Sequence, residues 1–278
     1  GHVLIEGVPG VAKTLLAPLT ARLIDADFSR IQFTPDLMPS DVLGTTVFNM
    51  KTNEFDFHQG PIFADIVLVD EINRAPAKTQ AALFEVMEER QISIDGITHK
   101  MGELYTILAT QNPVEQEGTY KLPEAQLDRF LMKITMDYPS LEEEVNILER
   151  HHTNASLIKL DDIKPAITKE ELLSLRALMN QVFVDRTLLQ YIALIVQQTR
   201  TSKAVYLGAS PRASVAMLQS SKAYALLQGR DFVTPEDIKF VAPYVLQHRL
   251  ILTAEAEMEG YSPVKVTQRL IDKVEVPK

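Results

Sequence analysis

Two glycines, a lysine and a threonine stand together near the start of the chain, in the segment Gly7-Val8-Pro9-Gly10-Val11-Ala12-Lys13-Thr14. An apolar run at residues 2–6 precedes this segment, and a helical pattern follows it. In this setting backbone N–H groups can wrap phosphate oxygens, because glycine permits close approach and the helix N-terminus adds partial positive charge. Lys13 would reach the β- and γ-phosphates, and the hydroxyl of Thr14 would contact Mg²⁺. The segment is a P-loop motif and predicts a nucleotide site.

One position of this loop departs from the general pattern. Ala12 occupies the place where the motif usually has its second glycine. Alanine is acceptable there only with a helical, negative φ, so we expect that conformation. The alternative interpretation is a plain strand-to-helix turn that happens to contain two glycines and a lysine. If the loop does bind phosphates, the contacting residues are expected to be Gly7, Val8, Pro9, Gly10, Val11, Ala12, Lys13, Thr14 and Leu15.

Two adjacent acids, Asp70 and Glu71, end the apolar run at residues 66–69. Carboxylates at the end of a buried strand do not favour stability, but ligands of open α/β sheets bind at this carboxyl edge. Asp70 would hold Mg²⁺ together with Thr14, and Glu71 would polarise the attacking water as general base. The alternative is a solvated acid pair at a strand end, which the order of the two motifs along the chain disfavours.

Short apolar runs alternate with helical patterns over the first half of the chain. Buried strands are predicted at residues 2–6, 30–34, 65–69, 104–110 and 130–136, and helices at residues 14–25 and 76–90. Near-continuous apolar strands separated by helices indicate a parallel sheet covered on both faces. Residues 44–60 and 91–101 interrupt this alternation with the pattern of β-hairpins, and Asp95-Gly96 is a strong hairpin turn signal.

The pattern changes after Pro139. Helices are predicted at residues 141–152, 169–182, 186–199, 211–228, 235–247 and 249–259, with no convincing strand between them. We therefore expect an α/β fold in two domains. Residues 1–138 would form a parallel-sheet nucleotide-binding core with two hairpin insertions, and residues 139–278 would form an all-helical domain.

Composition excludes several classes of protein. The 278 residues include 28 basic and 37 acidic side chains, a net charge of −9, which argues against a protein built mainly to hold nucleic acid. The absence of cysteine excludes disulfides, thiolate metal sites and cysteine nucleophiles. No run approaches the roughly 18 apolar residues of a membrane span, and no signal peptide is visible. We expect a cytoplasmic protein.

Four stretches together resemble the MoxR family of AAA+ ATPases. They are GVPGVAKT, LVDEINRAPAKTQAALFEVMEERQ, ATQNPVEQEGTYKLPEAQLDRF and GASPRAS. The resemblance covers residues 4–276, and alanine at position 12 is usual in that family. It implies an AAA+ core with a helical lid, ATP and Mg²⁺ as cofactors, and hydrolysis of ATP to ADP and phosphate.

The resemblance also implies roles for residues outside the P-loop and the acid pair. Asn112 matches sensor 1, an amide that orients the attacking water, and its plainer interpretation is a turn former before Pro113. Arg129 matches the arginine finger, which would project into the neighbouring subunit's site, and otherwise would form a surface ion pair with Asp128. The expected catalytic residues are therefore Glu71, Asn112, Arg129 and Arg212.

Arg212 matches sensor 2, carried on the second domain and closing over the nucleotide. Its plainer interpretation is a solvated residue in the first turn of a helix. A cation is electrostatically unfavourable there, which favours a functional reason for it. Arg74, just after the acid pair, is a further candidate for facing a neighbouring subunit.

Partners are implied only by the family. The resemblance implies a ring of identical subunits, expected to be a hexamer. It also implies chaperone-like work on a protein client in complex assembly or metalloenzyme maturation, alongside a von Willebrand factor A-domain protein. The hairpins at residues 44–60 and 91–101 would face the ring's centre and contact the client or partner. Phe48, Phe55 and Phe57 either supply apolar contacts or simply pack the first hairpin.

Other functions stay open at this point. A magnesium-chelatase-type motor subunit is the main alternative among AAA+ ATPases. A nucleotide-gated scaffold would bind ATP with little turnover, but it would not need Glu71 as a general base. A small-molecule kinase would need an acceptor pocket and no Arg129. A GTPase would carry an Asn-Lys-x-Asp signature, which the sequence lacks. The acidic balance disfavours a nucleic-acid motor.

Overall fold

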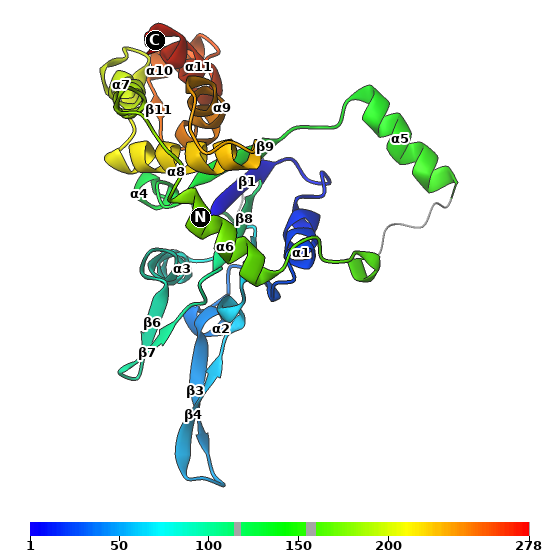
Figure 1. The fold of residues 1–278 in the computed structure, drawn as a ribbon. Coiled ribbons are helices and arrows are strands. Elements are labelled where there is room, and N and C mark those ends of the chain that lie inside the picture. The colour runs from blue at the N-terminus through cyan, green and yellow to red at the C-terminus, as the bar shows by residue number, and fades with distance from the viewer. Residues whose placement is uncertain (114–117, 154–159, 278) are drawn as a thin grey trace. The chain divides into compact units, whose positions relative to one another are not determined.

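The computed structural model describes residues 1–113, 118–153 and 160–277, drawn as a ribbon in Figure 1. The chain divides into two compact units. The first contains Gly1–Leu122 and Ile134–Leu172, and the second contains Pro123–Lys133 and Leu173–Lys278. Each unit buries its own apolar cluster. Across the described ranges, no helix is long and apolar enough to cross a membrane.

A five-stranded sheet forms the centre of the first unit, with the strand order β2-β5-β8-β1-β9. Its strands are β1 (Val3–Gly7), β2 (Phe28–Gln32), β5 (Ile66–Asp70), β8 (Thr106–Gln111) and β9 (Met132–Met136). β8 pairs in parallel with β1 and β5, and β5 pairs in parallel with β2. The predicted parallel sheet is confirmed, and the carboxyl ends of these strands meet at one edge.

Helix α1 (Lys13–Leu23) packs on this sheet through small side chains. Ala17 and Ala21 are buried in one apolar cluster with Ile66 and Leu68 of β5. Short side chains let the helix lie close to the strands, so the start of α1 is held at a fixed distance from the end of β5. This packing places the P-loop relative to the acid pair.

Both predicted hairpins are present. The first pairs β3 (Gly44–Asn49) with β4 (Glu54–Gln59), and the second pairs β6 (Gln91–Ile94) with β7 (Ile97–Lys100). They also contact each other.

Two interactions join these hairpins. Thr46 Oγ1 donates a hydrogen bond of 2.6 Å to Asp95 Oδ2, and the rings of Phe57 and His99 lie 4.3 Å apart. Phe57 therefore packs between the hairpins, whereas Phe55 is 73% exposed.

The described part of the first unit contains six further elements. They are α2 (Pro39–Leu43), η1 (Pro61–Phe63), α3 (Ala77–Glu89), α5 (Leu141–His152), η2 (Leu160–Asp162) and the start of α6 (Lys169–Met179). Helix α3 buries Leu83, Phe84 and Met87, whereas Ala77 and Ala81 on the same helix are exposed.

Helices dominate the second unit. Its elements are α4 (Glu124–Leu127), α7 (Arg186–Thr201), β10 (Val205–Leu207), α8 (Pro211–Leu227), α9 (Pro235–Leu246), β11 (Ile251–Leu252), α10 (Ala254–Met258) and α11 (Pro263–Lys273). The core includes fully buried Ile195, Met217 and Ile238. The side chain of Ser210 caps α8 by accepting from the N–H of Arg212.

The helix predicted at residues 249–259 is wrong in its first half. Strand β11 occupies part of it, pairs antiparallel with β10 and buries Leu252, while α10 begins only at Ala254. Three consecutive apolar residues, Leu250-Ile251-Leu252, do not have a helical period, which is the signal that the prediction overlooked. The helical unit therefore also contains a small two-stranded sheet.

The compact units do not divide at residue 138. Lys169 Nζ lies 2.7 Å from both carboxylate oxygens of buried Asp65, and Ala166 N donates to Leu23 O over 2.8 Å. These contacts hold residues 160–172 to the first unit, whereas residues 123–133 belong to the helical unit. The boundary between a nucleotide-binding core of residues 1–138 and a helical domain of residues 139–278 stays a prediction.

Candidate nucleotide site

The P-loop connects β1 to α1, as the sequence predicts. Gly7 lies against the end of β9, and a Cβ atom at this position would lie only 2.6 Å from Met136 O. Gly10 has a φ of 85°, a conformation that glycine adopts without strain. The Nζ atom of Lys13 donates to the carbonyl oxygens of Gly7 and Val8. The lysine ammonium thus lies inside the turn of the loop.

The conformation predicted for Ala12 is wrong. Its φ is 57° and its ψ 26°, so the residue is left-handed rather than helical, and it forms the N-cap of α1. Its carbonyl accepts from Leu15 N over 3.0 Å, which starts the helix. A left-handed non-glycine residue stores about 1–3 kcal/mol of strain. The loop therefore carries backbone strain directly before Lys13.

The P-loop threonine and the strand acid come together. Thr14 Oγ1 lies 3.5 Å from Oδ2 of Asp70, which is the last residue of β5. The other carboxylate oxygen, Oδ1, accepts from Thr110 Oγ1 at 2.5 Å, and Arg30 Nη2 lies 2.7 Å from Oδ2. The Asp70 carboxylate is buried but has a charge partner and hydrogen bonds, as burial of a charge requires.

Glu71 begins the turn after β5 in a left-handed conformation, with a φ of 56°. Its N–H donates to Thr110 Oγ1 over 3.0 Å. Its carboxylate oxygen Oε2 accepts from Gln32 Nε2 at 2.9 Å and lies 3.1 Å from Arg74 Nε. Arg74 therefore pairs with an acid of its own chain, and two polar side chains orient the candidate general base.

Asn112 directly follows β8, the strand next to β5 in the sheet, and is buried. The parallel arrangement puts the ends of the two strands at the same sheet edge. The structure thus gathers Lys13, Thr14, Asp70 and Glu71 with Asn112 at the end of the first unit's sheet.

The candidate metal ligands fit magnesium rather than a site built from protein ligands alone. Within the described residues, no group of three or more histidine, aspartate or glutamate side chains could hold a metal ion. Mg²⁺ is instead usually bound through one or two protein oxygens, substrate phosphates and water. The oxygens of Thr14 and Asp70, 3.5 Å apart beside the P-loop, suit that arrangement.

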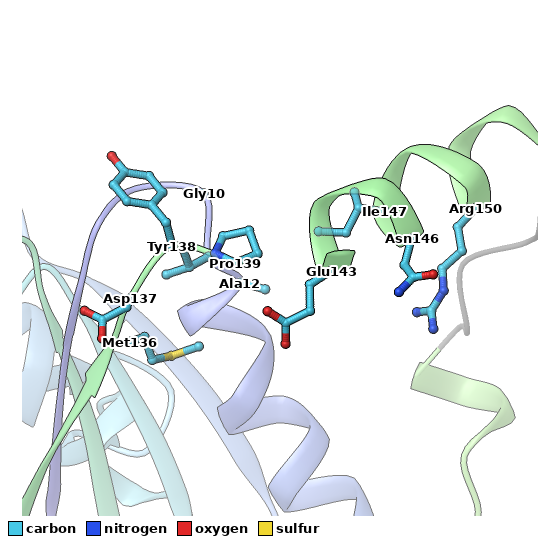
Figure 2. Close-up of a pocket in the computed structure, with 11 residues that line it drawn as sticks. Gly10, Ala12, Met136, Asp137, Tyr138, Pro139, Glu143, Asn146, Ile147 and Arg150 are labelled. Atoms are coloured by element: carbon cyan, nitrogen blue, oxygen red, sulfur yellow. The ribbon is translucent and has the colours of Figure 1, made fainter. Parts of the chain in front are cut away.

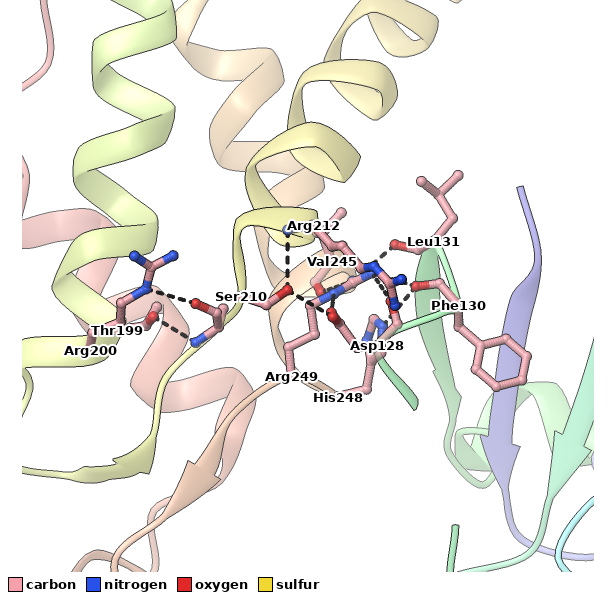
Figure 3. Close-up of polar contacts among 11 residues, drawn as sticks. Asp128, Phe130, Leu131, Thr199, Arg200, Ser210, Arg212, Val245, His248 and Arg249 are labelled. Atoms are coloured by element: carbon pink, nitrogen blue, oxygen red, sulfur yellow. Dashed lines mark hydrogen bonds and ion pairs between the residues drawn. The ribbon is translucent and has the colours of Figure 1, made fainter. Parts of the chain in front are cut away.

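The two predicted arginines belong to the other unit. Arg129 lies half-buried just after α4, and Arg212 lies exposed in the first turn of α8. Asp128, the alternative partner considered for Arg129, accepts from Ser210 Oγ and Arg249 Nε, each at 2.7 Å (Figure 3).

A cavity of about 580 Å³ opens beside the P-loop, within the first unit. Its lining combines the loop, the end of β9 with the chain that follows it, and α5: Gly10, Val11, Ala12, Met136, Asp137, Tyr138, Pro139, Glu143, Asn146, Ile147 and Arg150. Tyr138 and Pro139 lie beside the loop in Figure 2, with Glu143 opposite them on α5. Apolar and polar groups thus surround a space next to the phosphate-binding turn.

Sequence reasoning missed three side chains that organise the acid pair. Arg30 and Gln32 lie on β2, which pairs with β5, and Thr110 lies on β8. The pairing of β5 with β2 and β8 brings these side chains to Asp70 and Glu71. The sequence signal that could have found them is a polar residue near the carboxyl end of each neighbouring strand. That signal is readable only once the strand order is known.

Three features define a P-loop ATPase of the AAA type: a P-loop between β1 and a helix, an acid pair at the end of β5, which β8 separates from β1, and a helical second unit. Two family models agree with this assignment. Residues 2–132 match the ATPase family associated with various cellular activities (AAA), and residues 197–272 match the AAA lid domain.

Individual relatives identify the family within this class. Chaperone MoxR1 of Mycobacterium tuberculosis is 45% identical over 287 residues, covering 100% of this chain and 75% of that protein. Protein YeaC of Bacillus subtilis is 48% identical over 280 residues, covering 100% and 86%. A crystal structure of a protein from Cytophaga hutchinsonii superposes with a TM-score of 0.90 at 42% identity, covering 100% and 86%. The chain belongs to the MoxR family of AAA+ ATPases, and nucleotide binding follows from that membership.

Proposed function

We propose that this protein hydrolyses ATP to ADP and phosphate with Mg²⁺, and that it acts as a ring-forming, chaperone-like remodeller. The contact of Thr14 with Asp70 carries the proposal, because it joins the P-loop to the acid pair. Membership of a family that includes a protein named Chaperone MoxR1 supports the chaperone-like part.

The positions of the residues, together with the family resemblance, support the proposed roles. Lys13 neutralises charge on the β- and γ-phosphates, and Thr14 and Asp70 hold Mg²⁺, which when bound stabilises the charge that develops on the phosphates. Glu71, oriented by Gln32 and Arg74, accepts a proton from the attacking water. Asn112 helps to orient that water.

The nucleoside occupies the cavity beside the P-loop in this proposal. The cavity contacts Gly10 and Ala12, so a base and ribose placed there would continue directly from phosphates held by the loop. Tyr138 supplies an aromatic face, and the backbone of Asp137 and Pro139 supplies polar groups for hydrogen bonding.

Arg129 completes the site of a neighbouring subunit in a ring, which we expect to be a hexamer. An arginine finger accelerates phosphoryl transfer about 10³- to 10⁵-fold, so an isolated subunit would bind ATP but hydrolyse it slowly. Arg212 contacts the nucleotide from the helical lid and so couples the change from ATP to ADP to movement of that lid.

The hairpins are the proposed contact surface for a client or for a von Willebrand factor A-domain partner. Met50 is 89% and Phe55 73% exposed at the far part of the first hairpin. Exposed apolar side chains of this kind mark interaction sites. We place this work in assembly of protein complexes or maturation of metalloenzymes, in the cytoplasm.

Phosphate release tests the proposed reaction. With Mg²⁺ and ATP, the purified protein should release inorganic phosphate, and Glu71→Gln should stop release while ATP still binds. A phosphorylated acceptor in place of free phosphate would instead indicate a small-molecule kinase. ATP binding without release in the parent protein would indicate a nucleotide-gated scaffold.

The mass in solution tests the ring. Light scattering with a slowly hydrolysed ATP analogue should give a multiple of the 31.2 kDa subunit. A monomer both with and without the analogue would contradict a finger that acts between subunits. A magnesium-chelatase-type motor would share the ring and the hydrolysis, and would be recognised by stimulation of its ATPase by a chelatase partner.

A further inference from the structure

The guanidinium of Arg249 is buried and makes most of its hydrogen bonds to one short segment (Figure 3). Its Nε donates to Asp128 Oδ1 at 2.7 Å, and its Nη2 donates to the carbonyl oxygens of Asp128 and Phe130 at 3.1 and 2.6 Å. Its Nη1 donates to Leu131 O at 3.2 Å and to Val245 O at 2.5 Å. Four of these five hydrogen bonds therefore end on residues 128–131.

These bonds lie on both sides of Arg129. Asp128 precedes it, and Phe130 and Leu131 follow it, so the backbone that carries the predicted finger is bound before and after that residue. The two residues before Arg249 in sequence also contact the main chain that follows Arg129. His248 Nε2 lies 3.2 Å from Phe130 O, and Gln247 Nε2 donates to Lys133 O at 2.6 Å.

The carboxylate of Asp128 also accepts a hydrogen bond from the start of α8, the helix that carries Arg212. Ser210 Oγ donates to Asp128 Oδ2 at 2.7 Å and accepts from Arg212 N at 3.1 Å as the N-cap of α8. Asp128 thus bridges Arg249 and the start of α8. The segment that carries Arg129, predicted to act on a neighbour's nucleotide, and the helix that carries Arg212, predicted to contact the subunit's own nucleotide, are therefore joined by one set of hydrogen bonds.

Stability alone is a weak reason for this arrangement. Buried ion pairs often contribute less to folding than apolar side chains of the same volume would, because both charges lose their water. A guanidinium donates several hydrogen bonds in fixed directions within one plane, so it holds its acceptors in a defined arrangement. The contacts of Arg249 fix the path of residues 128–131 in this way.

We propose that Arg249 is a positioning residue for Arg129, which it holds through Asp128 and the neighbouring main chain, so that the finger moves with the helical lid and with Arg212. The proposal rests on the function proposed above, in which Arg129 acts on a neighbour's nucleotide. It adds that the lid, not the nucleotide-binding core, sets the position of the finger.

The first test compares turnover with binding. Arg249→Lys keeps the charge beside Asp128 but loses the fork, so turnover should fall at least 10-fold while ATP affinity stays within about twofold. Arg230→Lys is the matched control, because Arg230 makes a two-pronged ion pair with buried Asp237 in the same unit, at 2.8 and 2.6 Å. It should lower thermal stability without lowering turnover.

The second test asks whether Arg249 acts through Arg129. In an Arg129→Ala background, Arg249→Lys should have no further effect on turnover, whereas independent effects on folding would add. Mixing Arg249→Lys subunits with Glu71→Gln subunits should give more phosphate release than the two separate preparations together. In such a ring, an intact site can meet an intact finger from its neighbour.

Failure of this inference differs from failure of the proposed function. If Arg129→Ala leaves turnover unchanged, the assignment of Arg129 as an arginine finger is wrong. If Arg129→Ala lowers turnover but Arg249→Lys acts no differently from Arg230→Lys, or adds to Arg129→Ala, the positioning role is overturned. Should Arg249→Lys not fold, Asp128→Asn carries the same comparison, because it keeps the side chain's shape and removes the ion pair.

Discussion

Oγ1 of Thr14 lies 3.5 Å from Oδ2 of Asp70, which brings together two residues 56 positions apart in sequence. Thr14 is placed by the start of α1 and Asp70 by the end of β5, so their contact depends on how α1 packs on the sheet. Enlarging Ala17 or Ala21 would push the two oxygens apart without touching either motif. The site therefore depends on small buried residues as much as on its polar ones.

Lys13→Ala should weaken ATP binding by about 10- to 100-fold. The variant removes charge-assisted hydrogen bonds to phosphate, which contribute about 1.5–3 kcal/mol each. Titration calorimetry with ATP and Mg²⁺ measures the change. Lys51→Ala, at an exposed position of the first hairpin, is the control and should bind ATP like the parent. Equal affinity in the Lys13 variant would reject the P-loop assignment.

Thr110→Val should lower both stability and turnover. Valine keeps the shape but removes the hydroxyl that donates to Asp70 and accepts from Glu71 N, in a residue that is 1% exposed. Leaving buried polar groups without this partner costs about 1–3 kcal/mol. Urea unfolding and phosphate release measure the two losses. Thr98→Val on the exposed second hairpin should change neither, and parental turnover in Thr110→Val would remove this residue from the site.

Arg129→Ala should reduce turnover about 10³-fold or more while nucleotide affinity stays close to parental. The reason is that a finger stabilises charge present only in the transition state. Phosphate release at saturating ATP, together with calorimetry, separates the two quantities. An exposed arginine of the helical unit, Arg186, gives the control variant Arg186→Ala. Equal turnover in Arg129→Ala and parent would exclude a role between subunits.

Stability should fall as the pH drops below 6.5. Burial, with a smaller contribution from the charge of Arg249, lowers the pKa of His248 to about 3. The unfolded chain takes up a proton on this residue near pH 6.5, whereas the folded protein does not, so acid favours unfolding. This residue alone should reduce the unfolding free energy by about 2 kcal/mol between pH 7.5 and 5.

His2 adds to that trend in the same direction, because burial lowers its pKa to about 4. Urea unfolding at several pH values between 5 and 7.5 measures the slope. His248→Gln should flatten the slope by the contribution of one histidine, and a profile identical to the parent's would show that His248 does not carry it.

Local patterns were sufficient to predict the parts of the molecule that depend on neighbours in sequence. The P-loop, the acid pair and the alternation of apolar strands with helices are all readable within windows of a few residues, and they gave the parallel sheet. The Asp95-Gly96 turn gave the second hairpin in the same way. The missed helix α11 was also readable, because Ser262-Pro263 starts it and Val266 with Leu270 marks its buried face.

Features that depend on distant residues could not be predicted in this way. The left-handed φ of Ala12 is set by the path of the loop between β1 and α1, and the partners of Glu71 are set by strand order. Arg249 was interpreted as the start of a helix. Its contacts reach residues about 120 positions earlier in the chain, beyond any local pattern.

The acceptors of Arg249 on residues 128, 130 and 131 include three main-chain carbonyls and only one side chain. Peptide carbonyls are the same whatever residue carries them. Evolution can therefore vary the side chains at positions 130 and 131 without removing the acceptors, whereas losing the arginine removes all four of its hydrogen bonds to residues 128–131 at once. In a collection of natural variants, change at position 249 should be the rarer event and should coincide with change at position 128.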